Sequence, residues 1–163
     1  MINKAKEFAI AAHADQKYGD KPYIVHLQAV VNNVQSYGVI AQVVAYLHDV
    51  VEDTEVSYED VKNAFGEFVA DCVAIVTDEP GEDRKQRKKM TYEKMAQVSG
   101  DLELALTVKA ADRLANIQAC AKGSNARLMA VYKSEHAVFT EAVYRMGLCD
   151  DIWEKIRTIM GDE

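Results

Sequence analysis

Residues 102–117 read LELALTVKAADRLANI, and this stretch decides the fold. Ser99-Gly100-Asp101 forms a break and a cap before it, and Gly123-Ser124-Asn125 is the next break, so we predict one long helix that ends near Lys122. A helix that is apolar on every side is usually surrounded by other helices. The sequence therefore predicts a central helix. Its apolar residues lie nearly all round its middle, at Leu102, Leu104, Ala105, Leu106, Val108, Leu114 and Ile117.

The rest of the chain shows the same helical periodicity, and only two prolines and eight glycines interrupt it. Gly38 and Pro80-Gly81 mark helix ends, and Ser57 with Asp60 gives a capping-box pattern at a helix start. We therefore predict an all-α protein, a bundle of about eight to ten helices. A polar turn is expected over residues 18–22. Besides the central helix, the predicted helices cover about residues 2–16, 25–37, 39–52, 57–66, 67–77, 83–98, 125–146 and 150–160.

Length and composition narrow the class of protein. A chain of 163 residues can bury a real core, and we predict one domain over residues 1–163. No apolar run approaches the roughly 18–20 residues that span a bilayer, and the amphipathic start does not resemble a signal peptide, so we expect no membrane partner. The three cysteines are far apart without CxxC spacing, which predicts reduced thiols and a cytoplasmic protein. The net charge of −7 argues against binding of DNA or RNA polymers.

The strongest sign of a chemical site is the stretch His48-Asp49-Val50-Val51-Glu52-Asp53-Thr54, which follows an apolar run. Four of the residues from 48 to 53 are types that bind metals or transfer protons. If the stretch is helical, positions 48, 49, 52 and 53 share one side, because residues three and four apart are neighbours. Burying that much charge without a partner is costly, and a divalent cation would be a suitable partner.

Two further polar residues lie in apolar surroundings. His26 begins a predicted helix, and Asp112 lies on the central one. With His48 and Asp49 they form a set of two histidines and two carboxylates, which suits Mn, Fe, Co or Zn better than Ca. Such a metal would lower the pKa of a bound water and create a nucleophile near neutral pH. A single histidine on an apolar face is more often a satisfied core residue, so the residues alone support a metal site and an ordinary core equally.

Six sequence blocks, in the same order, resemble the hydrolase domain of RelA/SpoT proteins, within the HD-domain phosphohydrolases and their H…HD…D pattern. The resemblance extends over about residues 5–120. It implies the HD-domain helical fold and, because the chain ends where a synthetase domain would begin, a small stand-alone hydrolase. The blocks are Ala11-Ala12-His13 with Gln16, Pro22-Tyr23-Ile24-Val25-His26, Leu47-His48-Asp49-Val50-Val51-Glu52-Asp53-Thr54, Phe65-Gly66, Val76-Thr77-Asp78, and Val108-Lys109-Ala110-Ala111-Asp112-Arg113-Leu114-Ala115-Asn116.

The resemblance assigns roles to particular residues. It implies Mn²⁺ as the cofactor, with another divalent transition metal as the alternative, and Glu52 and Asp53 as the catalytic acidic pair. Glu52 would orient the attacking water and accept its proton, and Asp53 would order the water or protonate a leaving oxygen. For an arbitrary acidic pair, a solvated helix end is the usual explanation. The implied metal ligands are His26, His48, Asp49 and Asp112.

Several residues are candidates for contacting a nucleotide substrate. By the resemblance, Asn116 contacts the nucleotide, although a structural amide is the alternative. Lys109 lies one turn before Asp112 and would either neutralise it or reach a phosphate, and Tyr132 would contact a base or ribose or else belong to the core. The run Arg84-Lys85-Gln86-Arg87-Lys88-Lys89 is either a solvated face or a source of side chains that close over phosphates.

The chain departs from the family pattern near the substrate residues. RelA/SpoT proteins carry an Arg-Lys pair after the glutamine that matches Gln16, whereas this chain has Lys17-Tyr18. Arg and Lys are not equivalent phosphate ligands, so the departure bears on which nucleotide is bound. We predict that Lys17 and Lys21 compensate for the missing pair. Leu27 replaces a usual proline, and Gln118-Ala119 replaces an Arg-Thr type of pair.

The resemblance implies metal-dependent hydrolysis of the 3′-pyrophosphate of ppGpp, pppGpp or a close adenine analogue, with release of pyrophosphate. One alternative is an HD-family phosphatase that acts on another nucleotide or phosphorylated metabolite and releases orthophosphate. A second alternative is a non-catalytic module that senses nucleotides, against which the intact Glu52-Asp53 pair argues.

Overall fold

A long buried helix, α8 (Leu104–Lys122), forms the centre of the molecule. The computed structural model describes residues 1–161. Every α8 residue from 105 to 115 is buried, which confirms the prediction of a central helix. The α-helix begins three residues later than the predicted cap, because Gly100–Glu103 form a 3₁₀ helix, η2, at its start.

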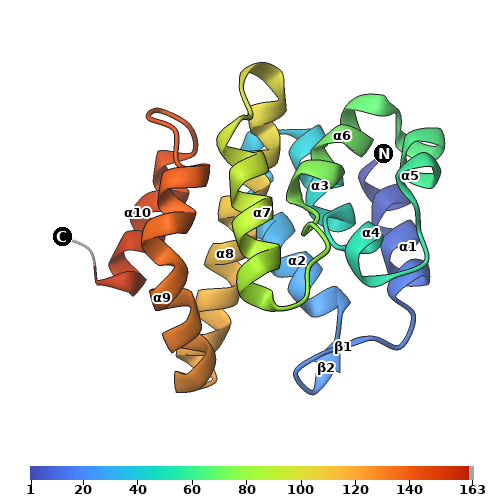
Figure 1. Cartoon of the computed structure of the whole chain (residues 1–163). Helices are drawn as coiled ribbons and strands as arrows, with labels where there is room; N and C mark the ends of the chain where they lie inside the picture. Colours follow the sequence, from blue (N-terminus) through green and yellow to red (C-terminus); the bar gives the residue numbers. More distant parts are fainter. Residues whose placement is uncertain (162–163) are drawn as a thin grey trace.

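The other helices surround α8. Helices α2 (Ile24–Asn33), α3 (Val39–Leu47) and α6 (Glu67–Val76) pack against one side of it. Helices α9 (Ala126–Val143) and α10 (Asp150–Met160) cover the other side (Figure 1). The described residues contain ten α-helices, so the all-α prediction is confirmed.

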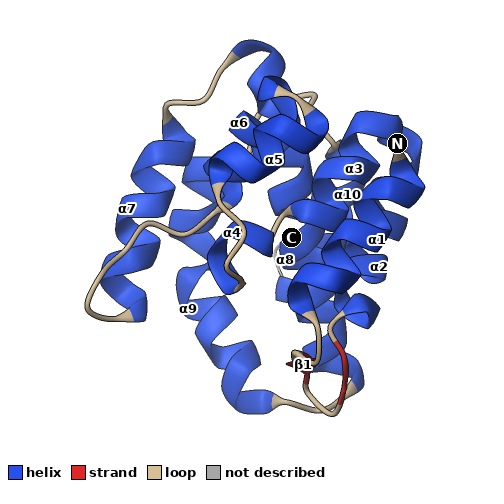
Figure 2. Ribbon diagram, turned by 90° about the vertical axis from the view of Figure 1, so that its right-hand side faces the viewer, coloured by secondary structure: helices blue, strands red, loops and turns tan. Residues whose placement is uncertain are grey.

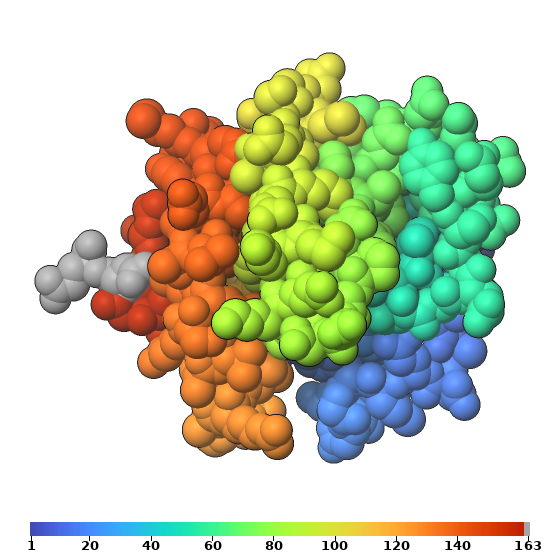
Figure 3. Space-filling model, viewed as in Figure 1, coloured from blue at the N-terminus to red at the C-terminus, as the bar shows by residue number. Residues whose placement is uncertain are grey.

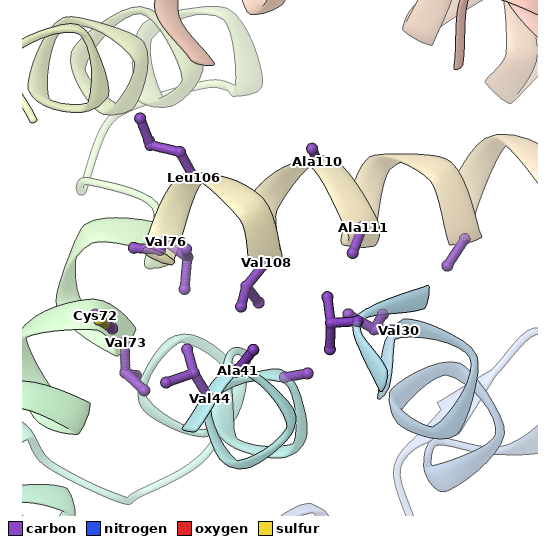
Figure 4. Close-up of a cluster of buried hydrophobic side chains, with 14 of the residues drawn as sticks. Val30, Ala41, Val44, Cys72, Val73, Val76, Leu106, Val108, Ala110 and Ala111 are labelled. Atoms are coloured by element: carbon purple, nitrogen blue, oxygen red, sulfur yellow. The ribbon is translucent and has the colours of Figure 1, made fainter. Parts of the chain in front are cut away.

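The core between α2, α3, α6 and α8 consists of small branched side chains. Figure 4 shows Val108 and Ala111 of α8 facing Val30 of α2 and Val44 of α3, with Val73 of α6 beside them. Burial of each valine contributes on the order of 1.5–3 kcal/mol, so this layer fixes how α2 and α3 lie against α8. Helices α2 and α8 carry His26 and Asp112 of the candidate site, and α3 leads directly into the turn that carries His48 and Asp49.

The remaining helices enclose this core. Helix α1 (Ile2–His13) packs on α3, α5 (Tyr58–Phe65) packs on α6, and α7 (Arg84–Ala96) packs on α6 and α9. Figure 2, seen from the side, shows α7 on the far edge from α1. The capping box at α5 is present as predicted, with Ser57 Oγ accepting from the Asp60 amide and the Asp60 carboxylate accepting from the Ser57 amide.

A small hairpin departs from the sequence prediction. Residues 18–22 were expected to form a polar turn, and the predicted first helix extended to residue 16. Instead α1 ends at His13, and Lys17–Tyr18 (β1) pairs antiparallel with Lys21–Pro22 (β2). Gly19 permits the tight turn because its φ of +62° is accessible to glycine without a Cβ clash.

Two predicted helices are interrupted. The segment 25–37 is α2 followed by the 3₁₀ helix η1 (Gln35–Tyr37). The segment 39–52 is α3 followed by the four-residue α4 (Val50–Asp53), with a turn at residues 48 and 49. At the break the Ala45 carbonyl accepts a hydrogen bond from His48 Nδ1 at 2.7 Å, and helical bonding resumes with the Asp53 amide on the Asp49 carbonyl. The expectation that residues 48, 49, 52 and 53 share one continuous helix face is therefore wrong.

The chain's thiols are buried and free. Cys72, Cys120 and Cys149 form no disulfide. Among residues 1–161, no helix combines the length and the apolar character needed to cross a bilayer.

Candidate active site

Two helices and one turn bring together two imidazoles and two carboxylates. His26 lies in the first turn of α2, His48 and Asp49 form the turn after α3, and Asp112 lies in the middle of α8. His26 Nε2 is 3.0 Å from Asp112 Oδ1 and 3.8 Å from Asp49 Oδ2. His48 Nε2 is 3.0 Å from Asp49 Oδ2 and 3.4 Å from Asp112 Oδ1. We call these four residues the His-Asp cluster.

The hydrogen bonding of His48 indicates that the cluster requires a proton or a metal ion. A backbone carbonyl only accepts, so Nδ1 must donate to the Ala45 carbonyl, and the Nε2 lone pair of the neutral ring is then left facing the cluster. His48 is 1% exposed, and Nε2 meets neither nearby carboxylate in hydrogen-bond geometry. A buried lone pair beside two carboxylates is unfavourable unless a proton or a metal ion lies between them.

The electrostatics of the cluster favour a bound positive charge. Burial disfavours a charged His48, but Asp49 and Asp112 overcome this and raise its pKa well above the ordinary value. Burial would likewise raise the Asp49 pKa, yet the neighbouring His48 lowers it to about 2. A proton and a metal ion compete for such a lone pair. One ligand atom from each of His26, His48 and Asp49 lies within 4.8 Å of the others, so the donor set fits a divalent metal.

Asp112 is the most heavily contacted member of the cluster. Its Oδ2 accepts from Lys109 Nζ at 3.2 Å, and its Oδ1 accepts from Asn116 Nδ2 at 3.1 Å. Burial would raise the Asp112 pKa, but Lys109 and His48 hold it well below the usual value. Of the two roles considered for Lys109, neutralisation of Asp112 is present in the structure, and Lys109 also lines the adjoining cavity.

Two tyrosines contact the cluster. Tyr23 OH donates to Asp49 Oδ2 at 2.5 Å. The Tyr18 ring stacks on the His26 ring, with centroids 4.6 Å apart and planes at 14°, and its OH donates to Asn116 Oδ1 at 2.7 Å. Neither tyrosine was a candidate from the sequence. The available signal was the place of Tyr23 three residues before His26, one helical turn away.

The acidic pair lies at the edge of the cluster. Glu52 Oε1 accepts from the Asp78 amide at 2.6 Å, and Asp53 Oδ2 accepts from Gln16 Nε2 at 3.2 Å. Gln16 Oε1 in turn contacts His13 Nδ1 at 2.8 Å. Partial desolvation and the negative charge of Asp49 raise the pKa values of Glu52 and Asp53. Both acids remain in reach of solvent, but only Glu52 lines the cavity described next.

A polar cavity of about 230 Å³ adjoins the His-Asp cluster. Figure 3 shows a notch at the lower edge of the molecule, where α7 in yellow-green, α9 in orange and the N-terminal segment in blue meet. Four basic side chains line the cavity, and such a lining attracts anions. The lining residues are Tyr23, His26, Asp49, Glu52, Arg84, Lys88, Lys109, Asp112, Arg113, Asn116 and Tyr132.

Three of these basic residues form what we call the basic wall: Arg84 and Lys88 of α7 and Arg113 of α8. Arg84 and Lys88 are four residues apart, so they share one face of α7. They are the members of the run from 84 to 89 that line the cavity. Tyr132 lies beside the wall, with the Arg113 guanidinium 4.7 Å from its ring centroid.

Each member of the basic wall already has an acidic partner. Lys88 Nζ is 2.8 Å from Asp78 Oδ2. Arg84 Nη2 is 2.8 Å from Glu135 Oε1, and Arg113 Nη2 is 3.8 Å from Glu135 Oε2. Glu135 therefore lies behind two arginines that face the cavity, although it does not line the cavity itself.

The candidate substrate residues do not all meet at the cavity. Asn116, Lys109 and Tyr132 line it. Lys17 lies on β1 and is exposed, outside the lining. Leu27 is fully buried in the core, and the pair 118–119 is exposed on α8.

The chain is similar in sequence to known proteins. The family described as "HD domain" matches residues 5–149. The guanosine-3′,5′-bis(diphosphate) 3′-pyrophosphohydrolase MESH1 of Drosophila melanogaster is 34% identical over 121 residues, which cover 69% of this chain and 65% of that protein. MESH1 of Danio rerio is 34% identical over 125 residues, which cover 72% and 68%.

A longer relative and a solved structure show the same similarity. A guanosine-3′,5′-bis(diphosphate) 3′-pyrophosphohydrolase of Aquifex aeolicus (strain VF5) is 29% identical over 150 residues, which cover 90% of this chain but 22% of that protein. A solved metazoan orthologue of SpoT, reported to hydrolyse ppGpp, superposes with a TM-score of 0.83 at 25% identity. That superposition covers 98% of this chain and 93% of the other.

Proposed function

We propose, because this chain belongs to the HD-domain family, that it is a metal-dependent hydrolase of the 3′-pyrophosphate of ppGpp, pppGpp or a close adenine analogue. The products are pyrophosphate and the nucleotide with a free 3′-hydroxyl. We also propose Mn²⁺ as the metal, because two imidazoles and two carboxylates combine borderline nitrogen with hard oxygen ligands. His26, His48, Asp49 and Asp112 are the proposed ligands.

The observation that carries this proposal is the unsatisfied His48 Nε2 between two carboxylates. Buried ring nitrogens are usually hydrogen-bonded to protein or water, and although His13 Nε2 also has no partner, His48 Nε2 lies 3.0 and 3.4 Å from two carboxylate oxygens. Here the Ala45 carbonyl fixes one nitrogen, and the other faces the His-Asp cluster without a hydrogen-bond partner among the described residues. This is the arrangement of a metal-binding imidazole whose second nitrogen is anchored to the backbone.

The residues at and around the cluster have different proposed roles in the reaction. His26, His48, Asp49 and Asp112 would hold a divalent cation, which would supply Lewis-acid chemistry for water activation and phosphate polarisation. Glu52 has one oxygen fixed by the Asp78 amide, and its other oxygen is available to accept the proton of the attacking water. Its raised pKa brings it closer to the neutral range in which a general base is most effective.

Asp53 has a separate position and a separate role. Its carboxylate is held by Gln16 at the edge of the cluster, outside the cavity lining. Partial desolvation and the negative charge of Asp49 raise the pKa of Asp53, and the proposal assigns to Asp53 the proton that the ribose 3′-oxygen takes up as pyrophosphate leaves. Together Glu52 and Asp53 would accept one proton and return one, which balances the hydrolysis.

The basic wall supplies the substrate preference. A nucleotide with two pyrophosphate groups is strongly anionic, and Arg84, Lys88 and Arg113 line the cavity beside the cluster. Arginine can bind a phosphate through two parallel hydrogen bonds, which fixes its orientation as well as its charge. Tyr132 offers an aromatic face for the base or ribose, and Asn116 and Lys109 complete the proposed contacts.

Product analysis tests the proposal directly. Protein loaded with Mn²⁺ is incubated with a panel of guanosine and adenosine tetra- and pentaphosphates, and the products are identified by mass. We expect pyrophosphate and a 3′-hydroxyl nucleotide. Orthophosphate instead would identify an HD phosphatase of another type, and no turnover across the panel would favour a nucleotide-sensing module.

The matched variant for this experiment is Glu52→Gln. The amide keeps an oxygen for the Asp78 N–H but cannot accept the proton, so turnover should fall by about 10²–10⁴-fold. Elemental analysis should show an unchanged metal content, because Glu52 is not a proposed ligand. Turnover within a few-fold of the parent protein would remove Glu52 from the mechanism.

A further inference from the structure

We propose that Tyr18, the last residue of β1, and Tyr23, directly after β2, are positioning residues that hold the His-Asp cluster in the arrangement that accepts a metal. This inference rests on the proposed metal site and adds to it two residues that are neither ligands nor acid–base groups. The hairpin would then determine metal affinity without contacting the metal.

Tyr23 acts on the carboxylate of Asp49. Its OH donates to Oδ2 at 2.5 Å, and this same oxygen faces both imidazoles, 3.0 Å from His48 Nε2 and 3.8 Å from His26 Nε2. A charge-assisted hydrogen bond of this kind is short and directional, so it selects one carboxylate rotamer. Without the phenol, Asp49 could turn its oxygen away from the imidazoles towards solvent.

Tyr18 acts on two other members of the cluster. Its ring stacks on His26 at 4.6 Å, which fixes the plane of that imidazole. Its OH donates to Asn116 Oδ1, which leaves the Asn116 amide hydrogens to donate to Asp112 Oδ1. That oxygen lies 3.0 Å from His26 Nε2. Tyr18 therefore contacts one proposed ligand directly and a second through Asn116.

The hairpin is built to present these two side chains. Tyr18 and Tyr23 are partly buried, whereas the residues between them, 19–22, are all exposed. The Tyr23 amide donates to the Gln16 carbonyl at 3.1 Å and closes the base of the hairpin. The tyrosine rings also meet edge to face, with centroids 6.1 Å apart. The inward contacts of the two tyrosines thus include His26 and Asp49 of the His-Asp cluster.

Metal binding measured without turnover tests the inference. The metal-free protein is titrated with Mn²⁺, and free Mn²⁺ is followed by electron paramagnetic resonance. Tyr23→Phe keeps the ring and removes only the donor to Asp49, and we expect a dissociation constant about 10–100-fold higher. Tyr18→Phe should weaken binding less than Tyr18→Leu, because phenylalanine retains the stacking on His26. Excess Mn²⁺ should restore turnover in each variant.

The control is Tyr58→Phe. Tyr58 OH donates to Asp71 Oδ1 at 2.6 Å on α5 and α6, so this variant removes a similar phenol–carboxylate bond away from the cluster. Its Mn²⁺ affinity should equal that of the parent. If Tyr23→Phe and Tyr18→Leu bind Mn²⁺ as tightly as Tyr58→Phe, the inference is overturned. A parent protein that binds no Mn²⁺ would instead remove the proposed metal site.

Discussion

The His-Asp cluster and the basic wall line the same cavity but differ in how their charges are compensated. In the cluster, Lys109 pairs with Asp112 but not with Asp49, and the His48 Nε2 lone pair has no hydrogen-bond partner among the described residues. In the basic wall, every cation already has an acidic partner within 4.0 Å. The cluster therefore has an excess of negative charge, whereas the three cations of the wall are largely compensated by the two carboxylates of Asp78 and Glu135.

This difference predicts that the two regions of the cavity bind their ligands with different strength. A cation entering the cluster meets ligands that gain from it, because the metal relieves the repulsion between a lone pair and two acids. A phosphate entering the basic wall must compete with Asp78 and Glu135 for the same donors. Under the proposed function, we expect the metal to be bound more tightly than the anionic substrate or product, which would favour release of pyrophosphate.

The largest effect should follow from removing a carboxylate of the cluster. Asp112→Asn takes away one proposed ligand and half of the negative charge, so metal content should fall to background and turnover should be lost. It also removes the charge of the carboxylate that pairs with the buried Lys109, which costs up to about 3–5 kcal/mol of folding free energy. Elemental analysis and urea unfolding measure the two effects separately.

The control for this variant is Asp71→Asn, which removes another hydrogen-bonded carboxylate, the one that accepts from Tyr58 on the far side of α6. Metal content should match the parent there. Equal metal content in the Asp112→Asn protein would refute the ligand assignment, and the cluster would then be an internal ion-pair network.

The two regions were not equally predictable from sequence. The apolar residues on all sides of α8 predicted its place in the core. The polar residues among them were candidates for a functional site. The break at His48 could not be foreseen, because it depends on the side chain bonding to the Ala45 carbonyl rather than on any helix-breaking residue. Periodicity alone favours a continuous helix there.

The members of the basic wall could be identified only from the structure. Sequence showed five cations in residues 84–89, but the rotation of α7 about its axis depends on its packing against α6 and α9, which selects Arg84 and Lys88. The contribution of Tyr18 was missed for a related reason. A tyrosine in a polar turn gives no sign of which histidine its ring will cover once the hairpin folds.

A smaller effect should follow from removing an acidic side chain that pairs with the basic wall. Glu135→Gln keeps an oxygen for Arg84 but removes the charge shared by Arg84 and Arg113. Inhibition by pyrophosphate should become about two- to fivefold tighter, which corresponds to less than about 1 kcal/mol for a partly exposed pair. Glu141→Gln makes the same charge change at an exposed position of α9 and should have no effect. Unchanged inhibition in both variants would show that Glu135 does not limit anion binding.

The smallest effect should come from Lys17, which was predicted from sequence to grip a phosphate. Its side chain is exposed on β1 and lies outside the cavity lining, whereas its neighbour Tyr18 faces inward. An exposed cation beyond the cavity acts on the substrate mainly through screened long-range attraction. Lys17→Ala should therefore change KM by less than about twofold at physiological salt, in steady-state assays at saturating Mn²⁺. A larger rise in KM with unchanged kcat would mean that the anion site extends past the basic wall to the hairpin, and that phosphate binding and metal positioning share one segment of the chain.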